Sequence, residues 1–343
     1  MVSTNAINEL ENFREAMLPA IEEVLQAEVD KAGGSGTVEL REMLRYHLGW
    51  EGEGSGRKAQ GKRIRPLLVL LAAEAAGGKW EDVLPSAAAV ELLHNFSLIH
   101  DDIQDNSSMR RGRPTLWTKW GIPQSINAGD SLFALAHDSL KGLKKHSTDV
   151  YANSIEVLPL TSLKLTQGQY MDLAFEGKEE VSIQEYWEMV GGKTAVLLAT
   201  CAELGAIGAQ ASKERSAHFR LFGEKLGLAF QAHDDILGIW GSENQTGKSN
   251  HSDLLSRKKS LPVLFGLAKG GKFAEIWPNW KPEESSVNEL ARALENDGAR
   301  GQATDMVGAL TQEALTALDL AKPETAAGEA LKMLGFELVQ RNY

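Results

Sequence analysis

The sequence predicts an all-α protein, a single domain of ten or more helices that covers residues 1–343. Three observations favour this fold class. Long segments rich in Ala, Leu, Glu and Lys recur, strictly alternating runs of Val, Ile and Thr are scarce, and turn residues fill the breaks. Hydrophobic residues make up 43% of the 343 positions, which is enough to bury a sizeable core.

Each helix is placed by its apolar repeat and by the turn residues beside it. No break is long or biased enough to be an inter-domain linker. In chain order, the expected helices cover residues 5–31, 38–48, 61–77, 82–105, 124–142, 150–175, 182–207, 212–238, 256–268, 285–296 and 299–321, with a last one that ends near 340. In such a bundle, carboxylates can project inward between the helices.

Charge and cysteine content argue against several functions. A net charge of −11 disfavours nucleic acid as the partner. Cys201 is the single cysteine, which excludes an intrachain disulfide and a cysteine-based zinc site. The N-terminal segment lacks the basic start and apolar run of a signal peptide, and the longest apolar run, residues 66–78, is too short to span a bilayer. We therefore expect a cytoplasmic protein without stable membrane insertion.

A first carboxylate cluster lies in "SLIHDDIQDN", residues 97–106. On a helix, Asp101 and Asp105 are i,i+4 neighbours, about 6 Å apart along the axis, on the same face as His94. Like charges at this spacing repel each other and weaken a helix. An apolar helix that carries them therefore needs a compensating cation.

A second cluster lies in "FQAHDDILGI", residues 230–239. Gln231, Asp235 and Gly238 share one face, Asp234 lies one row over, and Gly238 stands where a third aspartate would complete the repeat. Ligands that are all oxygen favour Mg²⁺, Mn²⁺ or Ca²⁺ over zinc. The alternative to a metal site is that the acidic residues simply lie at a solvated end of a helix. This alternative is reasonable for one acidic triplet, but it is weaker for two matched clusters on apolar helices.

Basic residues that could face a phosphate occur in four sets. "GKRIRP" lies at the expected start of a helix, where backbone N–H groups also favour anions. "GGKTA" has two glycines in a helical pattern, which indicates a kink or a close backbone approach. The cations of the four sets are Lys62, Arg63, Arg65, Arg110, Arg111, Lys193, Lys248, Lys258 and Lys259. Each set alone is typical of a solvated face. "TGKS" is not a P-loop, since Ser242 stands where that motif needs glycine.

Six segments in order resemble the motifs of the trans-isoprenyl diphosphate synthases, the polyprenyl synthetase family. They are "GKRIRP", "HNFSLIHDDIQDNSSMRRGRPTLW", "QGQYMDL", "GGKTA", "FQAHDDILGIWG" and "SDLLSRKKSLP", which together span residues 61–262. The resemblance implies the isoprenoid synthase type I fold around a deep central cavity, and a homodimer with its catalytic sites inside each subunit. It also implies a prenyltransferase that condenses isopentenyl diphosphate with an allylic diphosphate.

The resemblance also implies roles for individual residues. The diphosphate of isopentenyl diphosphate would be bound by Lys62, Arg65, His94 and Arg111. The allylic diphosphate would be bound by Arg110, Lys193 and Lys258, with Lys248 nearby. Three Mg²⁺ ions, for which Mn²⁺ could substitute, would be held by Asp101, Asp105 and Asp234, with Asp102 and Asp235 in support. Gln169, Thr194 and Gln231 would line the reacting centre. The residues expected to act in catalysis are Asp101, Asp105, Asp234, Lys193, Thr194, Gln169 and Arg110.

Product length is expected to depend on the residues that precede the first cluster. Phe96 lies five residues before Asp101, and Ser97 lies four before it. A lone aromatic there, with no insertion in Asp-Asp-x-x-Asp, resembles geranylgeranyl (C20) synthases of the archaeal type. The alternative product is that of a farnesyl (C15) synthase. The alternative role of Phe96 is that of an ordinary core residue.

Two more distant functions stay open. A class I terpene cyclase also uses an aspartate-rich helix, but its second motif, Asn/Asp-x-x-Ser-x-x-x-Glu, is not found opposite the first cluster. A non-catalytic partner subunit would be expected to have lost metal-binding aspartates, and here Gly238 replaces one of six. We expect that loss to affect only the water around a third metal, so that Gly238→Asp is tolerated.

Overall fold

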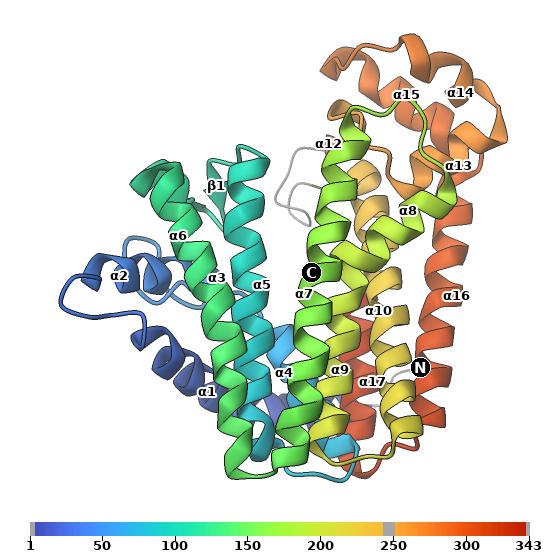
Figure 1. Ribbon diagram of the computed structural model, residues 1–343. Coiled ribbons are helices and arrows are strands. Elements are labelled where there is room, and N and C mark those ends of the chain that lie inside the picture. The colour runs from blue at the N-terminus through green and yellow to red at the C-terminus, as the bar shows by residue number, and fades with distance from the viewer. Residues whose placement is uncertain (1–3, 243–250, 341–343) are drawn as a thin grey trace. The chain divides into compact units, whose positions relative to one another are not determined.

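The computed structural model describes residues 4–242 and 251–340 (Figure 1). Over these residues the protein is all-α, as the sequence predicts, apart from one two-stranded hairpin. By its internal contacts the chain divides into two compact units. Unit 1 comprises residues 1–162, 200–217 and 321–331, and unit 2 comprises residues 163–199, 218–320 and 332–343. The single domain and the central cavity stay predictions.

Unit 1 is built around an apolar helix. The helix α4 is buried on all sides from Leu67 to Ala73, as expected of a helix that is hydrophobic all round. The elements of unit 1 are α1 (Thr4–Asp30), α2 (Val38–His47), α3 (Arg57–Gln60), α4 (Ile64–Ala75), the 3-10 helix η1 (Trp80–Val83), α5 (Leu84–Gln104), β1 (Met109–Arg110), β2 (Arg113–Pro114), α6 (Leu116–Ser139) and the 3-10 helix η2 (Leu140–Lys145). The helices α5 and α6 lie side by side (Figure 1).

Unit 2 holds most of the C-terminal half of the chain. Its own elements are α8 (Ile183–Val190), the π-helical turn η3 (Gly191–Ala195), α12 (Ser252–Leu255), α13 (Leu261–Lys269), α14 (Lys272–Ile276), the 3-10 helix η4 (Trp277–Asn279), α15 (Glu284–Asn296) and α16 (Ala299–Leu320). Four further helices contribute residues to both units: α7 (Thr148–Glu176), α9 (Val196–Gly208), α10 (Lys213–Trp240) and α17 (Thr325–Gln340).

The segment after α5 departs from the sequence prediction. Met109 pairs with Pro114 and Arg110 with Arg113 in an antiparallel hairpin. Its two turn residues, Arg111 and Gly112, have φ of 50° and 74°, the positive values that two-residue hairpins require. The strands are too short to show alternation, so the sequence gives no strand signal here.

Two helix boundaries also differ from expectation. The helix expected over 124–142 begins at Leu116, and Gly121, with φ 76°, interrupts it. The helix expected over 256–268 begins only at Leu261, as α13, with Pro262 in its first turn, and the short helix α12 before it was not predicted.

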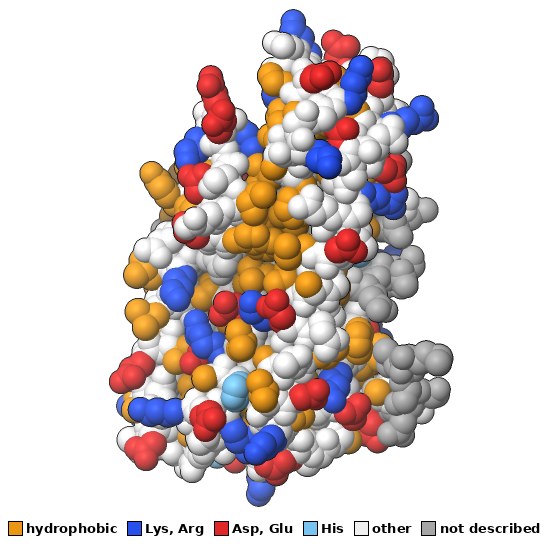
Figure 2. All heavy atoms as spheres, turned by 90° about the vertical axis from the view of Figure 1, so that its right-hand side faces the viewer, with side chains coloured by type: hydrophobic (Ala, Val, Ile, Leu, Met, Phe, Trp, Pro, Cys, Tyr) orange, Lys and Arg blue, Asp and Glu red, His pale blue; other side chains and the backbone are white. Residues whose placement is uncertain are grey.

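Among the described residues, one helical stretch is long and apolar enough to cross a membrane by those two criteria alone. It runs from Ile183 to Gly208, and 72% of its apolar window is buried inside the protein, as in a core helix. On the face drawn in Figure 2, acidic and basic side chains are interspersed and form no basic stripe.

Candidate active site

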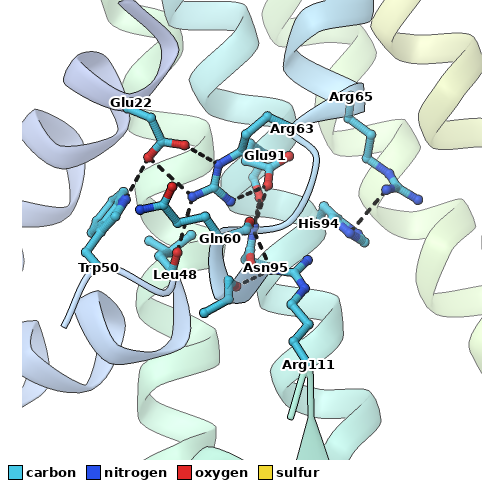
Figure 3. A network of polar contacts seen from close by, with 11 residues as sticks. Glu22, Leu48, Trp50, Gln60, Arg63, Arg65, Glu91, His94, Asn95 and Arg111 are labelled. Atoms are coloured by element: carbon cyan, nitrogen blue, oxygen red, sulfur yellow. Dashed lines mark hydrogen bonds and ion pairs between the residues drawn. The ribbon is translucent and has the colours of Figure 1, made fainter. Parts of the chain in front are cut away.

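A group of basic side chains gathers in unit 1 where α4 begins (Figure 3). Arg65 Nη1 lies 3.1 Å from His94 Nε2, which joins the start of α4 to the middle of α5. Arg111 of the hairpin turn donates from Nη1 to the carbonyls of Ala59 and Gln60, at 2.9 and 3.0 Å. The structure thus brings together three of the four residues predicted to bind isopentenyl diphosphate. The fourth, Lys62, is exposed and lies on the loop that leads into α4.

Like charges crowd one another in this basic group. Burial lowers the pKa of His94 well below its usual value, and the charges of Arg65 and Arg111 lower it further. Burial also lowers the pKa of Arg111, with Arg63 and Arg110 acting in the same direction against Glu91. Because a guanidinium can only donate, Nε2 of His94 is the acceptor in its contact with Arg65. An anion bound here would relieve the repulsion, which is typical of a phosphate site.

The first aspartate cluster divides by exposure. Asp102 is 2% exposed, and Arg110 holds its carboxylate with Nε at 2.9 Å from both oxygens and with Nη2 at 2.8 Å. Burial raises the pKa of Asp102 even though the bonds from Arg110 lower it. Asp101 and Asp105 lie one turn apart and are less buried. Asp102 therefore fixes the hairpin residue Arg110, and its expected support of bound metal ions stays a prediction.

The second aspartate cluster, in unit 2, divides in the same way. Asp235 is 1% exposed, and its carboxylate accepts from Tyr186 Oη at 2.7 Å, Leu261 N at 2.9 Å and Gln231 Nε2 at 3.0 Å. Asp234, the next residue on α10, is half-buried. Asp235 thus joins α8, α10 and α13, whereas Asp234 is only half-buried.

Of the three residues predicted to line the reacting centre, two are hydrogen-bonded to each other. Thr194 Oγ1 donates to Gln231 Oε1 at 2.9 Å, and Gln231 in turn donates to Asp235. Gln169 lies half-buried on α7, two turns from the expected helix end. Lys248 lies outside the described residues.

The two glycines before Lys193 lie in an irregular turn with a close backbone approach, as the sequence predicts. Residues 191–195 form a π-helical turn. A Cβ on Gly192 would lie 2.9 Å from the Lys164 carbonyl oxygen, and one on Gly168 would lie 2.1 Å from Lys193 N. The backbones of α7 and the π turn are therefore in direct contact. The turn points Lys193 at Asp172 of α7, with which it forms an ion pair.

Lys258 and Lys259 have different surroundings. Burial opposes the charge of Lys258, but Asp235, Asp253 and Asp172 together raise its pKa above the usual value. Its Nζ lies 3.8 Å from Asp235 Oδ1. Lys259 donates to the carbonyls of Phe175 and Glu176 and so caps the end of α7. Lys258 therefore belongs with the carboxylates, whereas Lys259 has a structural role.

Gly238 has a neighbour that the sequence did not reveal. A Cβ at this position would lie 2.4 Å from Asp253 Oδ2 and 2.5 Å from its Cγ. The carboxylate of Asp253 thus fills the place beside Gly238. A second carboxylate at 238 would meet this one, so the expectation that Gly238→Asp is tolerated conflicts with the structure.

Phe96 and Ser97 point to different neighbours. The Phe96 ring makes edge contacts with Phe133 of α6 at 5.1 Å and with His100 at 4.7 Å, between ring centroids. Ser97 Oγ donates to the His94 carbonyl at 2.8 Å and shares the helix face of Asp101. Phe96 is thus part of an aromatic contact between α5 and α6, and the small Ser97 lies one turn below Asp101.

The carboxylates fit a metal that also binds substrate. Among the described residues, no three or more His, Cys, Asp or Glu side chains converge to hold an ion by themselves. Mg²⁺ commonly takes one or two protein carboxylates and completes its shell with phosphate oxygens and water. Asp101 and Asp105 in unit 1, and Asp234 in unit 2, each offer only a few carboxylate oxygens, which suits Mg²⁺ or Mn²⁺ in the presence of a diphosphate.

Several supporting residues were missed from the sequence. They are Glu22, Glu91, Asp172, Tyr186 and Asp253. Asp172 and Asp253 lie inside the six motifs, so their position was a usable signal. Arg63 was expected among the cations that could face a phosphate, but it pairs with Glu22 and Glu91. Glu22 lies far from any motif and Tyr186 lies outside them, and only folding brings them to their partners.

The chain was compared with known proteins. The polyprenyl synthetase family model matches residues 55–296. A (2E,6E)-farnesyl diphosphate synthase of Mycobacterium bovis is 43% identical over 264 residues, 75% of this chain and 72% of that protein. A geranylgeranyl diphosphate synthase of Methanosarcina mazei is 37% identical over 262 residues, 76% and 80% of the two chains. The crystal structure of a polyprenyl synthetase from Streptomyces coelicolor superposes with a TM-score of 0.85 at 35% identity, covering 97% of this chain and 99% of that one.

Proposed function

Because the chain belongs to the polyprenyl synthetase family, we propose that it is a Mg²⁺-dependent prenyltransferase that condenses isopentenyl diphosphate with an allylic diphosphate. The observation that carries the proposal is the basic group of unit 1. Arg65, His94 and Arg111 meet where α4 begins, and burial, together with the surrounding positive charges, lowers the pKa values of His94 and Arg111. A diphosphate is the ligand whose charge suits that group.

The proposed reaction breaks the allylic C–O bond and forms a carbon–carbon bond. The electron pair of the C–O bond leaves with the diphosphate, and the double bond of isopentenyl diphosphate attacks the allylic carbon. Proton loss from the adjacent carbon then restores a double bond. The released diphosphate is the proposed base, so the reaction needs neither His100 nor His233.

The protein's residues act on the developing negative charge. Arg110, Lys193 and Lys258 would hold the departing diphosphate, and Asp101, Asp105 and Asp234 would bind the metal ions. Magnesium, when bound, would stabilise charge on the leaving group as a Lewis acid. The basic group at α4 would hold isopentenyl diphosphate in place, which raises the effective concentration of its double bond.

We propose geranylgeranyl diphosphate (C20) as the product, on the grounds that Phe96 stands alone as the aromatic residue five positions before Asp101 and that Ser97 is small. Phe96 contacts Phe133 and so can form the floor of a channel that runs along α5. Farnesyl diphosphate (C15) is the second candidate, favoured by the 43% identity to a farnesyl diphosphate synthase.

We also propose that the protein is a homodimer and that it is located in the cytoplasm. On α6, the exposed side chains Ile122, Ile126 and Phe133 fall within about 40° of one another and form an apolar stripe. Such a stripe suits a second copy of the chain. Light scattering on the purified protein tests this, since a monomeric mass at micromolar concentration would contradict it.

Product analysis tests the proposed function. Purified protein is incubated with isopentenyl diphosphate and allylic primers of five, ten or fifteen carbons, with and without Mg²⁺, and the dephosphorylated products are chromatographed. We expect the C20 alcohol from every primer, and only with Mg²⁺. A product that stops at C15 supports the second candidate, release of a hydrocarbon indicates a cyclase, and inactivity of the chain alone indicates a non-catalytic subunit.

A further inference from the structure

Arg63, in the middle of "GKRIRP", has a different environment from its neighbours. It is 4% exposed, and its guanidinium forms ion pairs with two carboxylates. Nε lies 2.6 Å from Glu22 Oε1, and Nη1 lies 2.9 Å from Glu91 Oε1. Nη2 donates to Glu22 Oε2 at 3.4 Å and to the Leu48 carbonyl at 3.2 Å. One buried guanidinium therefore connects α1, α5 and the end of α2 (Figure 3).

The two carboxylates are themselves fixed. Trp50 Nε1 donates to Glu22 Oε2 at 2.6 Å, and Asn95 Nδ2 donates to Glu91 Oε1 at 3.1 Å. Asn95 is fully buried on α5, one residue after His94. The charge of Arg63 is thus neutralised inside the protein, and its guanidinium donates to Glu22, Glu91 and the Leu48 carbonyl. It cannot serve as a phosphate ligand in this arrangement.

The backbone at Arg63 is as constrained as its side chain. Its φ of 49° and ψ of 37° lie in the left-handed region, where a residue other than glycine is uncommon. Arg63 is the residue just before α4, with Lys62 on one side and Arg65 two positions on. This conformation turns the chain between Lys62 and Arg65. Without the buried ion pairs, nothing in the residue type favours it.

The loop that Arg63 fixes also seats Arg111. Gly61 has φ 78°, and a Cβ there would lie 2.8 Å from the Arg111 guanidinium carbon. Arg111 also donates to the carbonyls of Ala59 and Gln60, which immediately precede this loop. A shift of residues 59–63 would therefore move Lys62, Arg65 and Arg111 together.

We propose that Arg63 is a positioning residue for the isopentenyl diphosphate site. Its ion pairs with Glu22 and Glu91 hold the left-handed turn before α4, and that turn presents Lys62, Arg65 and Arg111 to one diphosphate. The inference rests on the proposed function, because it assumes that these residues bind isopentenyl diphosphate.

The test compares Arg63→Lys and Arg63→Met with a matched control, Arg215→Met. Arg215 also donates to backbone carbonyls, at Ala76, Ala321 and Lys322, but near the opposite end of α4, about 18 Å from its start. We expect the Arg63 variants to raise the KM for isopentenyl diphosphate by about 10- to 100-fold. The KM for the allylic substrate and kcat at saturation should change by less than about threefold, with Arg63→Lys milder than Arg63→Met.

Calorimetry supplies a readout that does not depend on turnover. The Kd for isopentenyl diphosphate alone should weaken in parallel with its KM in the Arg63 variants and stay unchanged in Arg215→Met. If Arg63→Met fails to fold, Glu91→Gln replaces it in the same measurement. This substitution removes one ion-pair partner of Arg63 but keeps the shape of the side chain, so it perturbs the fold less. Variants that lose thermal stability but keep wild-type Kd and KM for isopentenyl diphosphate would overturn the proposal, as would equal losses for both substrates.

Failure of the proposed function has a different signature. If the wild-type protein neither binds isopentenyl diphosphate nor extends a primer, the assignment of the basic group is wrong. If the wild-type protein does both and the Arg63 variants match it, only the positioning role is wrong.

Discussion

At the scale of single residues, burial differs between the members of the two aspartate clusters. Asp102 and Asp235 are almost fully buried and bound by protein donors, whereas Asp101 and Asp234 are half-buried and Asp105 is exposed. A helix turns by 100° per residue, so adjacent aspartates necessarily face different surroundings. Each Asp-Asp pair thus has one carboxylate held by the protein, and we propose that the other binds a ligand.

This division predicts the effects of alanine substitutions. Asp101→Ala and Asp234→Ala should each lower turnover by about 10²-fold or more, because an accessible carboxylate that binds metal would be lost. Steady-state kinetics at saturating Mg²⁺ measure this. Asp138→Ala, which removes a surface ion pair with Lys141, is the control and should leave turnover unchanged. Near-normal activity of Asp234→Ala would contradict the proposal of a third metal.

Gly238 provides a second prediction at this scale. Gly238→Asp should lower the melting temperature and turnover, because the new side chain would meet the Asp253 carboxylate. Adding Asp253→Ala should recover part of both losses, since it vacates that space. Gly301→Asp is the control, as a Cβ on Gly301 meets nothing within 4 Å. Wild-type behaviour of the single variant would show that Asp253 moves aside at little cost.

Phe96 carries a prediction about product length. Phe96→Ala removes the ring that contacts Phe133, so a growing chain could pass beyond this level of α5. We expect products longer than those of the wild-type protein, seen by chromatography of the dephosphorylated alcohols. An unchanged product profile would exclude Phe96 as the floor of the channel.

At the scale of elements, the π-helical turn before α9 depends on the contact with α7. Gly168→Ala should destabilise the protein by roughly 1–3 kcal/mol or more, because its Cβ would overlap the backbone of Lys193. Gly191→Ala is the matched control in the same turn. A Cβ there meets nothing within 4 Å, so the substitution should be neutral or stabilise by up to about 1 kcal/mol. Chemical denaturation measures both, and equal effects would contradict the close contact.

The elements also show how far the sequence could predict this protein. Apolar repeats located most helices because buried helices carry that pattern regardless of their neighbours. The glycines at 191 and 192 correctly indicated an irregular turn. The hairpin at Arg111 was missed because two-residue strands have no period, and the partners of Arg63 were missed because Glu22 and Glu91 lie 41 and 28 residues away. Partners this distant in sequence leave no local signal.

At the scale of the whole molecule, two histidines near the basic group make the stability of the fold depend on pH. Burial, with the charges of Arg111 and Arg110, lowers the pKa of His47 to about 3, and His94 is lowered well below its usual value. Below pH 6.5 the unfolded chain binds protons that the folded protein does not. Stability is therefore complete above that pH and falls as the pH decreases.

The expected slope is about 1.4 kcal/mol per pH unit for each histidine. Urea denaturation between pH 5 and 8 measures it. His94→Gln and His47→Asn should each flatten the slope below pH 6.5. The absence of any difference between the wild-type protein and these variants would show that the histidines are protonated in the fold.

The most direct test of the central claim is the stoichiometry of diphosphate release. With an allylic primer, Mg²⁺ and labelled isopentenyl diphosphate, we predict one inorganic diphosphate released for each isopentenyl unit built into product. No release should occur when isopentenyl diphosphate is omitted. Release from the primer alone, or none under any condition, would contradict the assignment of this chain as a chain-elongating prenyltransferase.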